Sequence, residues 1–132
     1  MNVCSMAGKR RIVGPQLRSR FDAAASLRDV EALANEFLAA VEAGADLSAL
    51  GWPRSMYGVS KLCEATWTRI LADELKAAGI SVSACCPGWC ATNMSSFSGP
   101  HSAEQGADTP VWLALGQAPT GRFWSARKQE EF

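Results

Sequence analysis

Several residue types that binding and catalytic sites commonly use are scarce in this chain. Tyr57 is the only tyrosine, His101 is the only histidine, and 13 basic residues balance 13 acidic ones. A chain with no basic excess and no basic patch is not expected to bind nucleic acid. No stretch approaches the roughly 18 consecutive apolar residues of a membrane-spanning helix, and the first residues lack the apolar run of a secretory signal. We therefore expect neither nucleic acid nor a membrane as a partner.

The cysteines argue against two further kinds of site. The chain contains five of them, at Cys4, Cys63, Cys85, Cys86 and Cys90. An odd number with two adjacent members does not suit a disulfide framework, and free thiols are typical of a reducing compartment, which predicts a cytoplasmic protein. No pair has the Cys-x-x-Cys spacing and the histidine stands alone, so no metal site is expected.

The hydrophobic spacing predicts a single α/β domain. A chain of 132 residues, 48% of them hydrophobic, can bury one core. Ser26 followed by Asp29 has the pattern of a helix N-cap, and Gly44 is a natural helix stop. The expected elements are strands at 1–5, 80–86 and 122–125, helices at 27–43, 56–78 and 102–116, and irregular segments at 8–25, 45–54 and 89–101. Strands that alternate with helices predict a parallel sheet covered by helices.

Tyr57 and Lys61 lie four positions apart within one predicted helix, so they share one of its faces. A free tyrosine titrates at about 10, too high for efficient proton transfer at neutral pH, and a neighbouring ammonium lowers the pKa of the phenol. Such a pair can donate a proton to a carbonyl oxygen while a hydride arrives from elsewhere. The alternative is a chance spacing of two surface residues.

Five segments resemble motifs of one known family, and they favour proton donation by the Tyr57–Lys61 pair over a chance spacing. Residues 2–8 are similar to the family's strand end with a catalytic serine, and the tyrosine–lysine pair matches its Tyr-x-x-x-Lys motif. Residues 84–92 contain its Pro-Gly turn, and residues 106–114 and 121–125 match its C-terminal region. On these segments the chain resembles the short-chain dehydrogenase/reductases, and within them the NADPH-dependent carbonyl reductases.

The segment between Ser5 and Tyr57 is much longer than in most of that superfamily. Carbonyl reductases carry such an insertion, here residues 9–54, and in that branch it covers the face that other members use for pairing. The resemblance therefore implies a monomer. It also implies the C-terminal half of a Rossmann-type doubly wound parallel sheet, with a helical insertion before the helix of the Tyr-x-x-x-Lys motif.

The resemblance implies roles for seven residues. Tyr57 would be the general acid, Lys61 would lower its pKa and hydrogen-bond the nicotinamide ribose of NADPH, and Ser5 would hold the substrate carbonyl near Tyr57. Pro87, Gly88 and Thr92 would surround the nicotinamide and its phosphates, and Trp89 would wall the substrate pocket. The alternatives are that Ser5 merely ends a strand and that Trp89 packs in the core.

The Pro-Gly loop departs from the family at two positions. Cys90 and Ala91 stand where an aliphatic residue and an arginine are more usual. Cys86 and Cys90 flank the turn, where a reactive thiol would make activity sensitive to oxidation. A small buried hydrophobe is the favoured interpretation of these cysteines.

The glycine-rich turn G-x-G-x-x-G of the family's dinucleotide-binding half does not occur in these residues. We therefore expect residues 1–132 to be the C-terminal catalytic portion of a single domain, without its N-terminal half. Its unpaired sheet edge would be open to self-association or to another chain. Without a helix N-terminus for the pyrophosphate, NADPH binding and turnover by this portion alone are expected to be weak.

Two functions follow from the sequence. The first is NADPH-dependent reduction of aldehydes, ketones or quinones to alcohols, with Tyr57 as the general acid. The second is a non-catalytic remnant that acts by binding, with its open sheet edge docked on another chain.

Overall fold

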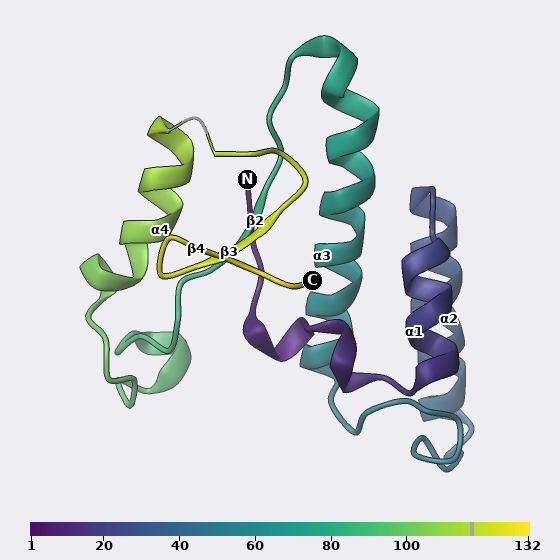
Figure 1. The fold of residues 1–132 in the computed structure, drawn as a ribbon. Helices are drawn as coiled ribbons and strands as arrows, with labels where there is room; N and C mark the ends of the chain where they lie inside the picture. Colours follow the sequence, from purple (N-terminus) through teal and green to yellow (C-terminus); the bar gives the residue numbers. More distant parts are fainter. Residues whose placement is uncertain (117) are drawn as a thin grey trace.

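A four-stranded sheet forms the centre of the molecule (Figure 1). The computed structural model covers residues 1–132 and describes all of them except residue 117. The strands are β1 (Asn2–Val3), β2 (Ala84–Cys86), β3 (Phe123–Ser125) and β4 (Lys128–Glu130), and they neighbour one another in that order. The first three run parallel, whereas β4 is antiparallel to β3. The α/β class with a mostly parallel sheet is confirmed.

The strand predicted at residues 80–86 is regular only over β2. The residues before it are extended but bond differently: the Val82 amide donates to the Thr120 hydroxyl at 2.9 Å, and the Ser83 carbonyl accepts from the Asn2 amide at 2.9 Å. A side-chain hydroxyl thus replaces one backbone partner, which shortens the strand without exposing its polar groups.

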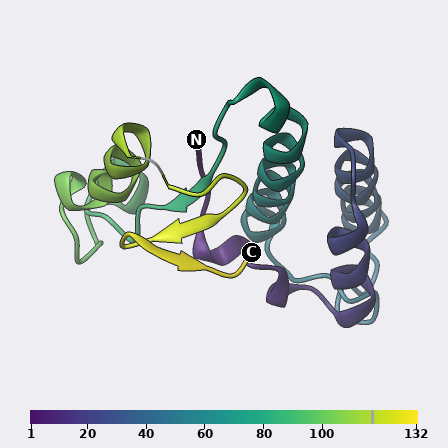
Figure 2. The same cartoon turned by 45° about the horizontal axis from the view of Figure 1, so that its top comes forward.

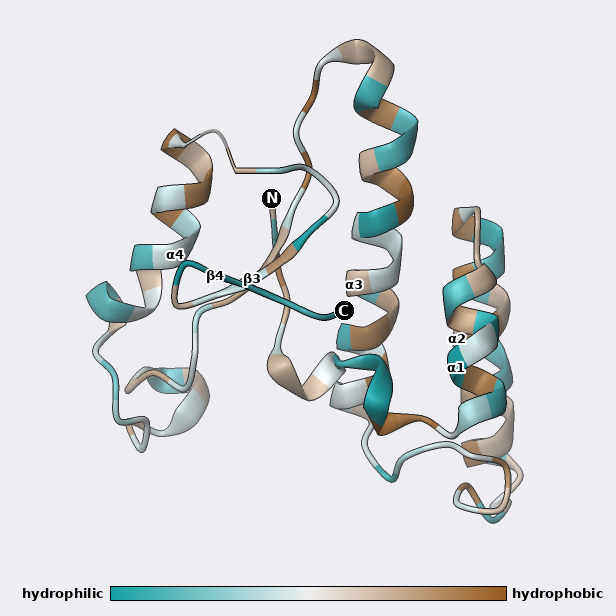
Figure 3. Cartoon of the chain, in the orientation of Figure 1, coloured by the Kyte–Doolittle hydropathy of each residue, from teal (hydrophilic) through white to brown (hydrophobic). Residues whose placement is uncertain are grey.

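The hairpin that adds β4 was not predicted. Ala126 and Arg127 connect β3 to β4 with φ angles of 48° and 58°, the left-handed pair that two-residue hairpin turns require. Asn or Gly normally mark such a turn, and neither occurs here. The strand itself is polar (Figure 3), so it has no apolar alternation to indicate it. The expectation of three parallel strands was wrong in this respect.

Helix α3 (Met56–Leu75) lies beside the sheet and carries the Tyr-x-x-x-Lys pair in its first two turns. The Ser55 hydroxyl caps its N-terminus by accepting a hydrogen bond from the Gly58 amide at 2.9 Å. The helix then tightens into a 3-10 turn over Lys76–Ala78 and ends at Gly79, whose φ is 70°. The predicted helix at 56–78 is therefore confirmed, with its last turn wound more tightly.

Two further helices lie on the side of α3 that faces away from the sheet (Figure 2). Helix α2 (Leu27–Glu42) begins with a reciprocal capping box between Ser26 and Asp29, as predicted. Helix α1 (Pro15–Ala23) occupies part of the segment that was expected to be irregular, and that expectation was wrong. Proline at the first helical position suits a helix start because its missing amide hydrogen would have no partner there.

The largest buried cluster lies between α3 and the segment 9–54. Trp52 is 2% exposed, and its ring lies 6.1 Å from that of Phe21 and 5.3 Å from that of Phe37. Val59 and Leu62 of α3 belong to the same cluster. The two helices of the 9–54 segment thus pack against the back of the helix that carries Tyr57 and Lys61.

Helix α4 (Ala103–Leu115) lies on the other side of the sheet (Figure 1). Ser102 and Gln105 form its capping box, and the helix predicted at 102–116 is confirmed. The rings of Trp112 and Trp124 lie 5.1 Å apart and join the helix to β3.

The two ends of the chain are linked through Lys9 and Glu130. The Lys9 ammonium lies 2.7 Å from the Glu130 carboxylate, and its side chain is only 10% exposed. Of the helices described, none combines the length and the apolar character needed to cross a membrane.

Candidate active site

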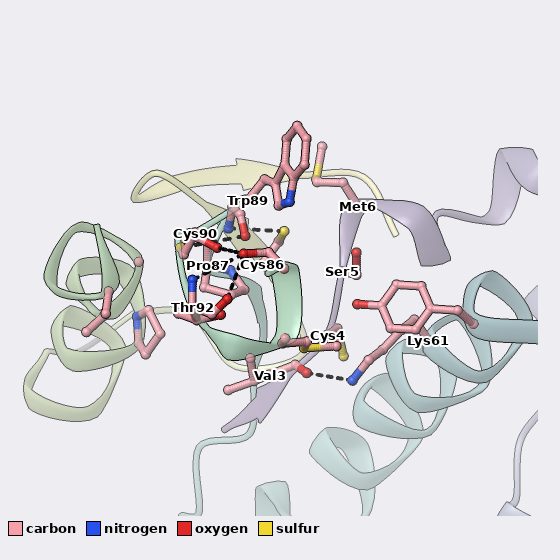
Figure 4. A pocket seen from close by; sticks show the side chains of 18 residues that line it. Val3, Cys4, Ser5, Met6, Lys61, Cys86, Pro87, Trp89, Cys90 and Thr92 are labelled. Atoms are coloured by element: carbon pink, nitrogen blue, oxygen red, sulfur yellow. Dashed lines mark hydrogen bonds between the residues drawn. The ribbon is translucent and has the colours of Figure 1, made fainter. Parts of the chain in front are cut away.

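A cavity of about 760 Å³ opens where β1 and β2 end. The carboxyl ends of parallel strands meet at one edge of a sheet, which is where α/β proteins place their ligands. Residues from the start of α3 and from α4 complete the walls. The lining includes all seven residues singled out from the sequence: Ser5, Tyr57, Lys61, Pro87, Gly88, Trp89 and Thr92. Figure 4 shows Ser5 and Lys61 on one side of this cavity, and Pro87 and Trp89 on the other.

Tyr57 and Lys61 enter the cavity from successive turns of α3. Tyr57 is 45% exposed, so its ring is open to a ligand. The Lys61 ammonium donates to the Val3 carbonyl at 2.9 Å and to the Glu64 carboxylate at 2.7 Å. The hydrogen bond with Glu64 is the main cause that raises the pKa of Lys61, and burial opposes it. Lys61 is therefore a fixed positive charge at the end of β1.

Ser5 lies beyond the end of β1 and caps the short 3-10 turn Met6–Gly8. Its Oγ accepts a hydrogen bond from the Ala7 amide at 3.1 Å, which leaves the hydroxyl hydrogen free to be donated. The turn packs closely on α3 because Gly8 has no side chain where the backbone of Lys61 passes. This contact brings the serine segment to the face of α3 that carries Tyr57.

The Pro-Gly loop forms the opposite wall. Gly88 has a φ of 83°, which favours glycine, and its amide donates to the Cys86 sulfur at 3.4 Å. Behind the loop, the Ala91 amide donates to the His101 carbonyl at 2.7 Å. His101 therefore supports the loop from behind through its backbone.

Trp89 stands at the mouth of the cavity, where Met6 faces it (Figure 4). With 62% of its surface exposed, Trp89 does not pack in the core. That alternative interpretation was wrong, and a role as a wall of the pocket stays a prediction. Thr92 lines the same cavity, and its carbonyl accepts from the Phe97 amide at 2.9 Å.

Two of the thiols near the site, Cys4 and Cys85, are held in their neutral form. Burial is the main cause that raises the pKa of Cys4 to about 12, and the charge of Glu64 adds to it. Burial likewise raises the pKa of Cys85 to about 11. Cys86 is buried and belongs to the same apolar cluster as Cys4, which agrees with the small-hydrophobe interpretation. Cys90 is partly exposed, and its sulfur lies 3.5 Å from the Pro87 carbonyl.

Sequence reasoning missed the contributions of four residues to this site. Glu64 was passed over, although its position three residues after Lys61 on a helix is a signal for an ion pair. Met6 and Met94 line the cavity as apolar surfaces; Met6 was quoted only as part of a motif, and no motif marks Met94. Gly8 was quoted only as part of a motif, because a close approach between segments far apart in sequence leaves no local pattern.

The comparisons with known proteins agree with this geometry. The family model described as short chain dehydrogenase matches residues 46–103. Carbonyl reductase [NADPH] 1 of Homo sapiens is 33% identical over 143 aligned positions, which cover 100% of this chain and 51% of the human protein.

The chain is similar to the short-chain dehydrogenase family along its whole length.

Other matches within this family are local or structural. Carbonyl reductase [NADPH] 3 of Rattus norvegicus is 54% identical over 69 residues, covering 49% of this chain and 25% of the rat protein. The structure of salutaridine reductase from Papaver somniferum superposes with a TM-score of 0.83 at 28% identity, over 93% of this chain and 43% of that one. The chain thus spans about half the length of the curated relatives that it matches along its whole length.

Proposed function

We propose that this chain takes part in the NADPH-dependent reduction of carbonyl compounds to alcohols. The proposal rests chiefly on one observation: Ser5, Tyr57 and Lys61 line the same cavity as the Pro-Gly loop. The names of the curated relatives, which are NADPH carbonyl reductases, support the same class of reaction. Aldehydes, ketones and quinones are the substrates that we would test.

The residues of the cavity divide the proton chemistry among them. The Ser5 hydroxyl donates a hydrogen bond to the carbonyl oxygen and so holds the substrate beside Tyr57. Tyr57 then gives its proton to that oxygen, which completes the alcohol. The Lys61 ammonium stabilises the phenolate that remains, because an adjacent positive charge favours the charged form. A solvent proton restores the phenol.

The nicotinamide end of NADPH suits this cavity, and when bound it would supply the hydride to the carbonyl carbon. A volume of about 760 Å³ is in the range of cofactor and small-molecule sites. Lys61 has one ammonium hydrogen left for a ribose hydroxyl, because two of its three are engaged. Pro87, Gly88 and Thr92 would surround the ring and the neighbouring phosphate. These residues contain no G-x-G-x-x-G turn, so the fit concerns the nicotinamide end alone.

The test is the loss of NADPH absorbance with a quinone, an aldehyde or a ketone added to the purified full chain. We expect reduction that falls by about 10²-fold or more in Tyr57→Phe, because the proton donor is removed. A titration of NADPH fluorescence measures binding separately from turnover. Binding is expected to be weak, since no glycine-rich turn holds the pyrophosphate.

Two serine variants give a matched control. Ser5→Ala should slow reduction, whereas Ser60→Ala should leave it unchanged, because among the described residues the Ser60 hydroxyl bonds only to the Tyr57 carbonyl within α3. If no carbonyl class is reduced, or if Tyr57→Phe is as fast as the natural chain, the proposed function is wrong.

The edge of β1 favours a second candidate, binding to another chain by strand addition. Among the described residues, β1 pairs only with β2, and Val3 is substantially exposed. Exposed strand edges pair readily with other strands. Analytical ultracentrifugation of the full chain and of Val3→Lys would test self-association, since a charge on an edge strand opposes pairing. A monomer at all concentrations would rule out self-association by this edge.

A further inference from the structure

Glu64 stands behind the lysine of the proposed active site. Lys61 lines the cavity and Glu64 does not, yet the two side chains meet at 2.7 Å, one turn apart on α3. The contact is partly shielded from water, since the side chains are 23% and 34% exposed. A contact of this kind is stronger than an ion pair in open solvent.

The position of the Lys61 ammonium is fixed by two acceptors on different elements. One is the Val3 carbonyl at the end of β1, and the other is the Glu64 carboxylate on α3. An ammonium has three hydrogens, so one remains for a ligand in the cavity. With the hydrogen bond to Val3 alone, the Lys61 ammonium could still change its orientation. The hydrogen bond to Glu64 fixes it at a second point.

We propose that Glu64 is a positioning residue that holds the Lys61 ammonium against the end of β1, with one hydrogen left for the cavity. The proposal rests on the proposed function, because it assigns Glu64 a part in the same site. Glu64 acts through Lys61 and touches neither substrate nor cofactor.

The charges around Lys61 support this assignment. The titratable groups that face its ammonium are Glu64 and Tyr57 from α3 and Cys4 from the segment after β1, and Met6–Gly8 adds none. Cys4 is held as a neutral thiol. Glu64 is therefore the carboxylate that balances Lys61, and removing its charge lowers the pKa of Lys61.

The first test measures the lysine directly and needs no turnover. The purified chain is labelled with an amine-reactive reagent over a range of pH, and the extent of labelling at Lys61 is read by mass spectrometry. Lys128, which is exposed on β4, serves as an internal reference. We expect Glu64→Gln to label Lys61 severalfold faster near neutral pH, with the midpoint of its labelling curve at lower pH. The plateau at high pH reports accessibility separately.

Two variants isolate the charge of Glu64. Glu64→Asp keeps the carboxylate on a side chain one carbon shorter and should restore part of the natural labelling curve. Glu74→Gln removes an exposed carboxylate farther along the same helix and should not change Lys61. If Glu64→Gln leaves the Lys61 midpoint unchanged in a folded protein, or if Glu74→Gln shifts it equally, the proposal is wrong.

The second test uses the pH profile of carbonyl reduction. In Glu64→Gln the alkaline limb should move to lower pH, because the carboxylate that balances the charge of Lys61 is lost, and Glu64→Asp should move it back. A merely structural role would lower the rate or the stability without moving that limb. If no carbonyl compound is reduced by any variant, the proposed function fails while the labelling test still decides the role of Glu64.

Discussion

Gly8 lies directly against Lys61. A Cβ atom placed on Gly8 would be 2.6 Å from the Cβ of Lys61 and 2.5 Å from its carbonyl carbon. Both of these atoms belong to a regular part of α3 and cannot move aside without disturbing the helix. This contact sets the distance between the serine segment and the tyrosine–lysine face, so the geometry of the site depends on a missing side chain.

Gly8→Ala is therefore expected to destabilise the fold and to separate Ser5 from Tyr57. Overpacking against a rigid neighbour costs typically about 1–3 kcal/mol, and contact with backbone predicts a loss near the upper value in the free energy of unfolding. Urea unfolding measures it. The control is Gly44→Ala, where the new Cβ meets nothing within 4 Å but φ is 62°, a strain of about 1 kcal/mol. Equal losses in the two variants would contradict the close contact.

Two tryptophans should differ sharply in their contribution to stability. Trp52→Ala empties the centre of the cluster between α3 and the segment 9–54, and large-to-small changes of this kind cost about 3–5 kcal/mol. Trp89→Ala removes a ring that is mostly exposed, and surface changes lie within about 0.5 kcal/mol. Thermal unfolding of both variants measures the contrast. A comparable loss of stability from Trp89→Ala would show that the loop is packed more tightly than the structure indicates.

The thiol of Cys4 should make stability depend on pH in the alkaline range. Because burial raises its pKa from 9.0 to about 12, the folded chain keeps this proton at pH values where the unfolded chain loses it. The contribution is thus fully present below pH 9.0 and is lost as the pH rises toward 12. As the pH rises above 9.0, the natural chain should therefore lose stability relative to Cys4→Ala. A constant difference between the two proteins would contradict the burial of this thiol.

The turn between β3 and β4 carries strain that a substitution can relieve. Ala126 has a φ of 48°, and asparagine tolerates this region much better than alanine does. Ala126→Asn is expected to raise the free energy of unfolding by about 0.5–1 kcal/mol. Ala126→Val, with a branched side chain in the same place, should lower it, because such residues are outliers at positive φ. Urea unfolding of both variants tests the turn, and a gain from Ala126→Val would overturn this description of it.

What the sequence could predict depended on whether a signal was local. The capping pattern of Ser26 and Asp29 located the start of α2, and the spacing of Tyr57 and Lys61 located the chemical face of α3, since each signal lies within one turn of helix. The polar strand β4 has no such pattern, because it is held by its pairing with β3. Helix α1 is short, and only Pro15 and the burial of Leu17 and Phe21 distinguish it from an irregular segment.

In the candidate site, too, the residues marked by local motifs were predicted, and the contacts between distant segments were not. Its seven predicted residues share one cavity because the motifs at the ends of β1 and β2 and the motif at the start of α3 converge in space. The second anchor of Lys61 and the contact at Gly8 depend on how α3 docks against β1, and docking is a property of the assembled fold.

The pair between Lys9 and Glu130 also has a kinetic consequence. It closes a loop of 121 residues, and closing so long a loop has an entropy cost that short-range contacts do not. We therefore place it late on the folding pathway, after α3 has docked on its neighbours. Breaking the pair would leave the nearly buried Lys9 ammonium without its partner carboxylate. Because the pair forms late, its main effect is to slow unfolding, and the rate of folding is almost unchanged.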